Sequence, residues 1–195
     1  MKKRVLSAHI LCFILIALCT ALLFGCASAA LTGAGVVYDR HALQKKLDDN
    51  YTSMKAYNKI YMDTRRYQNT NISVATFNGA VLLTGQIPDP NHKKEVEHIV
   101  RQLAGARKIY NYIEIASPSS PLIHASDSWI TTKIKAQFIA NNDLDPSQIK
   151  VVTENGTVYL MGILPRNQAE IATQIARTTS GVQNVVKIFS YLVIL

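Results

Sequence analysis

The sequence predicts an α+β fold made of two tandem copies of one small domain, each in the order α-β-β-α-β with two helices on a three-stranded sheet. The main observation is a repeat: residues 72–85 recur as residues 149–162, offset by 77 positions. Both segments alternate apolar residues around an Asn-Gly pair, a pattern typical of a β-hairpin with a tight turn. A Ser- and Pro-rich segment, Ala116–Pro121, separates the copies. A repeat this long suits a small domain rather than a solenoid unit.

The first 25 residues predict an export signal. Three basic residues, 2–4, precede the apolar run Val5–Phe24, and Cys26 follows a small residue. The cysteine at the cleavage point makes the segment resemble a bacterial lipoprotein signal, with Cys26 as the lipidated residue. The alternative is an uncleaved membrane anchor, because about 20 apolar residues can span a bilayer.

Residues 26–39 are interpreted as the lipidated N-terminus and a tether, since Ala27–Gly35 are nearly all small. In Gram-negative lipoproteins an Asp after the lipidated cysteine typically retains the protein in the inner membrane. By that resemblance, Ala27 implies the outer membrane, with the protein facing the periplasm. The chain has 21 Lys and Arg against 13 Asp and Glu, which favours polyanionic partners. Behind an export signal these are phospholipid headgroups and lipopolysaccharide phosphates, not nucleic acid.

The first domain is expected over residues 40–116. Helical spacing covers Arg40–Gln68, and the hairpin follows at Ile72–Thr84. Asp89 before Pro90 signals the start of a second helix, which ends at Gly105. Residues 106–115 supply the third strand.

The second domain is expected over residues 126–195, after a linker at 117–125. Asp127 or Ser126 is expected to cap a helix that runs to about Ala140. The hairpin spans residues 149–161, a helix ends at Gly181, and residues 182–195 form the last strand.

This order of elements and the paired Asn-Gly signatures resemble the BON domain, and two copies behind a lipoprotein signal are similar to dual-BON outer-membrane lipoproteins. The most specific stretches are residues 127–135 and 151–162; the first copy is Tyr-rich and departs more. The resemblance implies a protein without enzymatic activity or a cofactor. It also implies that the second domain binds anionic phospholipid (phosphatidylglycerol, cardiolipin). Finally, it implies support for envelope integrity and for the outer-membrane protein assembly machinery.

A lipid-binding patch is predicted on the first helix of the second domain, at Trp129, Thr132, Lys133 and Lys135. Trp129 lies off the core-facing stripe, above Lys133 at i+4, and Lys135 lies on a neighbouring edge. An aromatic ring beside lysines suits a membrane interface. The alternative is that Trp129 closes the rim of a small core.

Six further positions are assigned structural roles. Two Asn-Gly pairs, Asn78-Gly79 and Asn155-Gly156, are expected at two-residue turns. Gly85 and Gly162 end the second strand of each copy, where glycine is usually required for steric reasons.

Catalytic motifs are missing from the sequence, which lacks a nucleophile elbow, a phosphate-binding loop and a zinc-protease helix. His92, Glu95 and His98 lie at i, i+3 and i+6, a spacing that does not fit a helical metal site, so we expect no metal. The alternative function is a structural or assembly partner that acts through protein contacts, with lipid contact incidental.

Overall fold

The computed structural model describes residues 40–62 and 67–192, and within them it confirms the predicted α+β fold of two similar domains. Cys26, the predicted signal at 1–25 and the tether at 26–39 lie outside the described residues. The elements of the first domain are α2 (Arg40–Tyr61), β1 (Asn71–Phe77), β2 (Ala80–Gln86), α3 (Pro90–Arg101) and β3 (Lys108–Asn111). Those of the second are α4 (Pro121–Ala140), the 3-10 turn η1 (Pro146–Gln148), β4 (Ile149–Glu154), β5 (Thr157–Leu164), α5 (Arg166–Thr178) and β6 (Asn184–Tyr191).

Each sheet has the same topology. The order is β1-β2-β3 in the first domain and β4-β5-β6 in the second. The first two strands form an antiparallel hairpin, and the third runs parallel to the central strand after the helical crossover. The crossover helix and the opening helix supply the apolar side chains that cover one face of each sheet.

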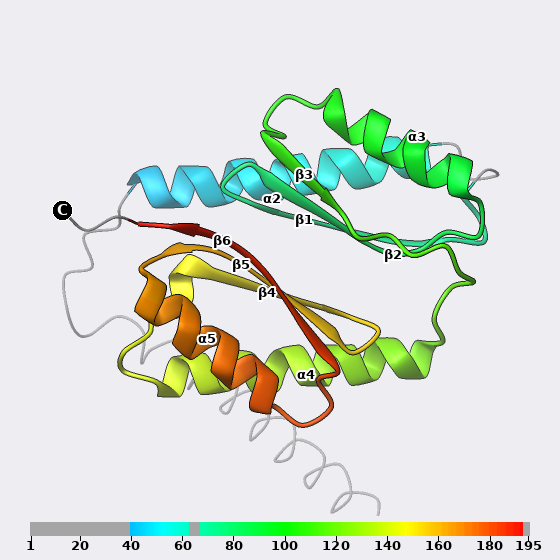
Figure 1. The fold of residues 1–195 in the computed structure, drawn as a ribbon. Coiled ribbons are helices and arrows are strands. Elements are labelled where there is room, and N and C mark those ends of the chain that lie inside the picture. The colour runs from blue at the N-terminus through cyan, green and yellow to red at the C-terminus, as the bar shows by residue number, and fades with distance from the viewer. Residues whose placement is uncertain (1–39, 63–66, 193–195) are drawn as a thin grey trace, which may run out of the picture. The chain divides into compact units, whose positions relative to one another are not determined.

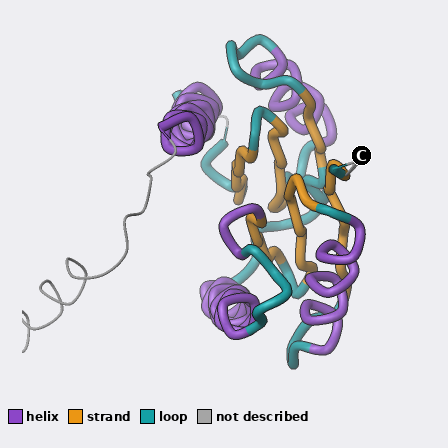
Figure 2. Tube along the Cα trace, turned by 90° about the vertical axis from the view of Figure 1, so that its left-hand side faces the viewer, coloured by secondary structure: helices purple, strands orange, loops and turns teal. Residues whose placement is uncertain are grey.

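The opposite face of each sheet is also buried, because the two sheets pack on each other. Ala75 and Leu82 of the first domain form one apolar cluster with Tyr159, Met161 and Ile188 of the second. In Figure 2 the strands accordingly lie in the middle and the helices on the outside, in four layers. A strand buried on both faces has a nearly continuous apolar sequence, and β5, Thr157–Leu164, has one.

An aspartate of the opening helix, half-buried at Asp49 and buried at Asp127, holds the hairpin turn of each domain. Asn78 and Gly79 have φ angles of 50° and 75°, and Asn155 and Gly156 have 48° and 71°, as a type I′ turn requires. The backbone N–H groups of the second pair donate to the Asp127 carboxylate at 2.7 and 2.9 Å. Asp49 of α2 accepts the equivalent bonds in the first domain, at 2.6 and 2.9 Å. The opening helix is thereby bound to the turn across the sheet edge.

The expected cap at Asp127 or Ser126 is therefore wrong. Helix α4 begins at Pro121, and the Ser120 side chain caps it by accepting from the N–H of Ile123. Residues 121–125, which we assigned to the linker, are helical. Ser followed by Pro at the first helical position is itself a helix start, while Asp127 lies in the helix interior and is buried.

Gly85 and Gly162 are required because neighbouring backbone lies close to them. The expectation that Gly162 ends its strand is wrong, since β5 continues to Leu164. A Cβ on Gly85, at φ 106°, would lie 1.9 Å from the carbonyl oxygen of Asn71. One on Gly162 would lie 2.8 Å from the carbonyl oxygen of Gln148. A larger residue would push away the start of β1 at the first position and the end of η1, just before β4, at the second.

We expect Asp127→Asn to lower the free energy of unfolding by about 2 kcal/mol, because an amide cannot accept both turn N–H groups and a bond to a charged acceptor is worth about 1.5–3 kcal/mol. Asp49→Asn should act in the same direction. Urea denaturation followed by circular dichroism measures the change. Asp143→Asn, at an exposed position, is the control, and an equal loss in the control would contradict the assigned role.

Candidate functional site

The outer face of α4 carries large apolar side chains that contact no core. Ile130, Ile134 and Phe138 point inward and are buried. On the other side of the helix Leu122, Trp129 and Ile139 are 79%, 64% and 74% exposed. At 100° per residue these three lie within one outward sector of the helix. Helix α4 is thus apolar on its core side and also on its solvent side.

The lysines of the predicted patch lie on opposite edges of this sector. Lys135 is exposed, while Lys133 is half-buried and its ammonium group donates to the backbone carbonyl of Ser180, just after α5. Thr132 is exposed beside Trp129, and its hydroxyl donates to the carbonyl of Ser128 within the helix. The structure therefore places Trp129, Thr132 and Lys135 on one accessible surface and gives Lys133 a structural contact.

Sequence reasoning missed Leu122 and Ile139. The signal was present in their spacing, since Leu122 lies seven residues before Trp129 and so falls on the same face of a helix. Because the helix was expected to begin near residue 126, Leu122 was assigned to the linker.

A second polar constellation lies between the sheets, around Glu154. The residue is only 9% exposed, and its carboxylate accepts from the side-chain amides of Asn71 at 3.1 Å and Gln86 at 2.9 Å, both in the first domain. In the other direction, the Lys150 ammonium donates to the carbonyl of Thr76 at 3.0 Å. Burial raises the pKa of Glu154 and lowers that of Lys150. These bonds tie the second domain to the first at fixed positions.

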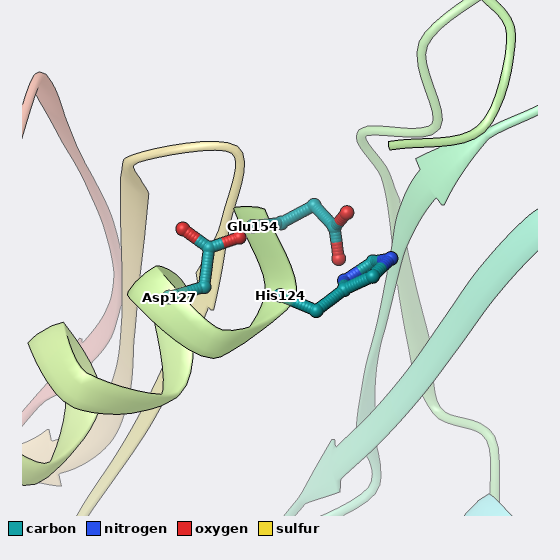
Figure 3. Close-up of side chains that lie close together, drawn as sticks. All are labelled: His124, Asp127 and Glu154. Atoms are coloured by element: carbon teal, nitrogen blue, oxygen red, sulfur yellow. The ribbon is translucent and has the colours of Figure 1, made fainter. Parts of the chain in front are cut away.

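His124, Asp127 and Glu154 approach one another closely enough to be considered as a metal site (Figure 3). Their ligand atoms lie within 4.8 Å of one another. The turn N–H groups already occupy both oxygens of Asp127, as they do in the first domain at Asp49. Glu154 is bound to two amides. Hydrogen bonds within the fold therefore explain the positions of both carboxylates, so their closeness does not by itself indicate a metal site.

Among the described residues, we find no helix with the length and apolar character needed to cross a bilayer.

Comparison with known proteins gives one family for both copies. The BON domain matches residues 48–117 and 126–192. The chain is 30% identical over 177 residues to the outer membrane lipoprotein DolP of Haemophilus influenzae, covering 89% of this chain and 92% of the relative. It is 32% identical over 154 residues to a 21 kDa hemolysin of Actinobacillus pleuropneumoniae, covering 79% of each. It is 26% identical over 142 residues to osmotically-inducible protein Y of Escherichia coli, covering 71% of this chain and 70% of the relative.

The raised pKa of Glu154 predicts that its contribution to stability falls as pH rises. The folded state holds this proton more tightly than the unfolded chain, so the loss begins near 4.5 and continues through the raised value. Glu154→Gln keeps an acceptor for Asn71 and Gln86 and cannot ionise. We expect its unfolding free energy, relative to the wild type, to increase from pH 4 to pH 7.

Glu154→Ala is the matched comparison for this measurement by urea denaturation. It leaves the buried amide of Gln86 without its acceptor and removes one of the two acceptors of the Asn71 amide, so it should destabilise at every pH. If the difference in unfolding free energy between the wild type and Glu154→Gln stays constant with pH, the raised pKa of Glu154 is contradicted.

Proposed function

The chain belongs to the BON domain family and carries two copies of that domain, and from this premise we propose that it is a non-enzymatic lipoprotein of the outer membrane that binds anionic phospholipid. The proposal places the anchor at Cys26, the protein on the periplasmic side, and the lipid contact on the outer face of α4. The observation that carries it is the exposed row of Leu122, Trp129 and Ile139, with Lys135 beside it. Its role would be to support envelope integrity and the assembly of outer-membrane proteins.

The dimensions of the α4 face suit a helix lying flat on a bilayer. Leu122 and Ile139 are 17 residues apart in one helix, which is about 25 Å at 1.5 Å per residue. A helix in the membrane interface inserts its apolar side chains among the upper acyl chains, with basic residues at headgroup level. The Trp129 ring is suited to that boundary because one edge is apolar and its N–H can contact water or a phosphate.

The lysines add preference for anionic lipid. A basic residue near an anionic surface contributes about 1 kcal/mol, so two give roughly 30-fold enrichment over neutral bilayers. Since Lys133 already donates to Ser180, we assign the larger share to Lys135. One acyl chain anchors a protein only marginally, and lipoprotein cysteines carry several. The α4 face is therefore proposed to select the lipid environment, not to provide attachment.

A second candidate function, as a structural or assembly partner, is favoured by the first domain. Tyr51, Met54 and Tyr57 of α2 are exposed large side chains at i, i+3 and i+6. Two of them, Met54 and Tyr57, line a hollow of about 540 Å³ against β1 together with Tyr61. Exposed aromatic and methionine side chains are enriched in protein interfaces, so this surface suits a protein partner.

Trp129→Ala should weaken binding to phosphatidylglycerol or cardiolipin vesicles by about tenfold, because burying a large apolar side chain contributes about 1.5–3 kcal/mol and 1.4 kcal/mol is tenfold. Vesicle flotation of unlipidated protein measures it. The fold should be retained, since Ile130, Ile134 and Phe138 form the core contact.

Tyr57→Ala, which removes an exposed ring from α2, is the control for that experiment and should bind as the wild type does. Lys135→Glu should reduce binding to anionic vesicles and leave the weak binding to neutral ones unchanged. Unaltered binding by both Trp129→Ala and Lys135→Glu would exclude α4 as the lipid site and favour the assembly role.

Cys26→Ser should release the protein from the outer-membrane fraction, because the proposed acyl chains attach at this sulfur. Mass spectrometry of the wild type should find an acylated residue 26 as the mature N-terminus. Recovery of an intact 1–24 segment would show instead that the apolar run is an uncleaved anchor.

A further inference from the structure

A hollow of about 310 Å³ lies between α5 and β6, on the helix side of the second sheet. Figure 1 shows the course of these two elements. Arg166, Glu170, Thr173 and Arg177 line it from the helix, and Lys187 and Tyr191 line it from the strand. Side chains alternate along a strand, so Lys187 and Tyr191 point to the same side as the core residues Leu160 and Leu164 with which they are paired.

The charge of this hollow is not balanced. It has three cationic groups and one carboxylate. Within residues 40–62 and 67–192, Arg166, Arg177 and Lys187 make no ion pair. The Arg166 guanidinium lies 4.7 Å from the centre of the Tyr191 ring, which holds it at one end of the hollow. A concave site with an excess of one sign of charge concentrates the electrostatic potential and attracts counter-ions.

The first domain provides an internal comparison, because the equivalent positions on α3 and β3 include an anionic side chain, Glu97. The buried residues Val96 and Val100 of α3 correspond to Ala172 and Ala176 of α5, an offset of 76. By that offset Arg101 corresponds to Arg177 and Glu97 to Thr173. The strand pairings give Asn111 as the equivalent of Lys187, since each lies opposite the matching leucine, Leu83 or Leu160.

In the first domain, the Glu97 carboxylate accepts from both equivalents. Arg101 donates to one oxygen and Asn111 donates to the other at 3.0 Å. The Asn111 bond, with the charge of Arg101, lowers the pKa of Glu97. The backbone geometry thus brings an arginine and a strand donor around one anionic group.

In the second domain both donor positions again carry a hydrogen-bond donor, but the anionic side chain is missing. Thr173 replaces the glutamate, and its hydroxyl donates to the carbonyl of Ala169. Lys187 replaces the asparagine, which changes a neutral donor to a positive one. We propose that this hollow binds a phosphate group of a lipid headgroup or small phosphate ester, held by Arg177 and Lys187 where Glu97 places its carboxylate in the first domain. Arginine binds phosphate through two parallel N–H bonds, and lysine adds a point charge.

The rest of the hollow is consistent with an esterified phosphate. Arg166 adds positive potential at the other end, while Glu170 lies between the two arginines along α5 and offers a carboxylate as a hydrogen-bond acceptor. A carboxylate repels phosphate but accepts from hydroxyl groups, so it favours a phosphate attached to a polyol. This site is on a different helix from the α4 face and does not depend on the proposed contact of Trp129 with lipid.

The test is an NMR titration of ¹⁵N-labelled protein of residues 40–195, which form one compact unit, with glycerol 3-phosphate and with inorganic phosphate. We expect signals of Arg177, Lys187 and Thr173 to shift. Arg177→Gln and Thr173→Glu should each weaken binding at least tenfold, the second because it installs the carboxylate of the first domain. Arg101→Gln, the equivalent change in the first domain, should bind as the wild type does.

The source of the phosphate is distinguished with vesicles of phosphatidylcholine with and without phosphatidic acid, measured in the Trp129→Ala background. Weaker binding to phosphatidic acid vesicles on adding Arg177→Gln indicates a headgroup. An effect confined to the soluble esters indicates a small ligand. If glycerol 3-phosphate shifts no signals in this hollow, or if Arg177→Gln binds it as tightly as Arg101→Gln does, the proposal is overturned.

Discussion

The burial of one sheet against the other is the constraint on which the rest of this structure depends. A three-stranded sheet with two helices on one face leaves an apolar face open, and such a face is unstable in water. Leu82 in the first domain and Tyr159 and Met161 in the second occupy those open faces and cover each other. Neither sheet therefore presents a free face to a ligand. The surfaces left for binding are the outer sides of the helices and the grooves at strand edges, where α4, α2 and the α5–β6 hollow are found.

Apolar packing alone does not fix how two sheets align, because hydrophobic contact is not directional. The polar contacts between the domains supply the direction. Glu154 is satisfied only when Asn71 and Gln86 lie opposite it, and any other alignment would leave a buried carboxylate without donors. The N–H of Ser119, just before α4, donates to the same Gln86 side chain at 3.0 Å. The segment that joins the domains and the interface between them are thus held by the same group of hydrogen bonds around Gln86.

The sequence predicts the two domains well because the hairpin pattern is local: alternation around Asn-Gly is visible within 14 residues, and it places Val81, Leu83, Val158 and Leu160 in the two helix-facing cores. It predicts the packing between domains poorly, because Leu82, Tyr159 and Met161 fall at the intervening positions. Those apolar side chains broke the alternation and were the available signal of the packing between the domains.

Asp127 was misassigned because an acidic residue near a helix start usually acts as a cap. The contact of Lys133 with Ser180 joins residues 47 apart and has no local pattern.

The two copies also show which residues maintain the fold and which distinguish the domains. Asp49 and Asp127 bind their turns in the same way, so they belong to the common scaffold. The outward residues differ, with tyrosines and methionine on α2 and Leu122, Trp129 and Ile139 on α4. Since the sheets lie between them, α2 and α4 are on opposite outer layers (Figure 1). A bilayer in contact with α4 would therefore leave the tyrosine-rich face of α2 directed away from the membrane, where a protein partner can reach it. Lipid contact and protein contact are, by this geometry, compatible functions of two different domains.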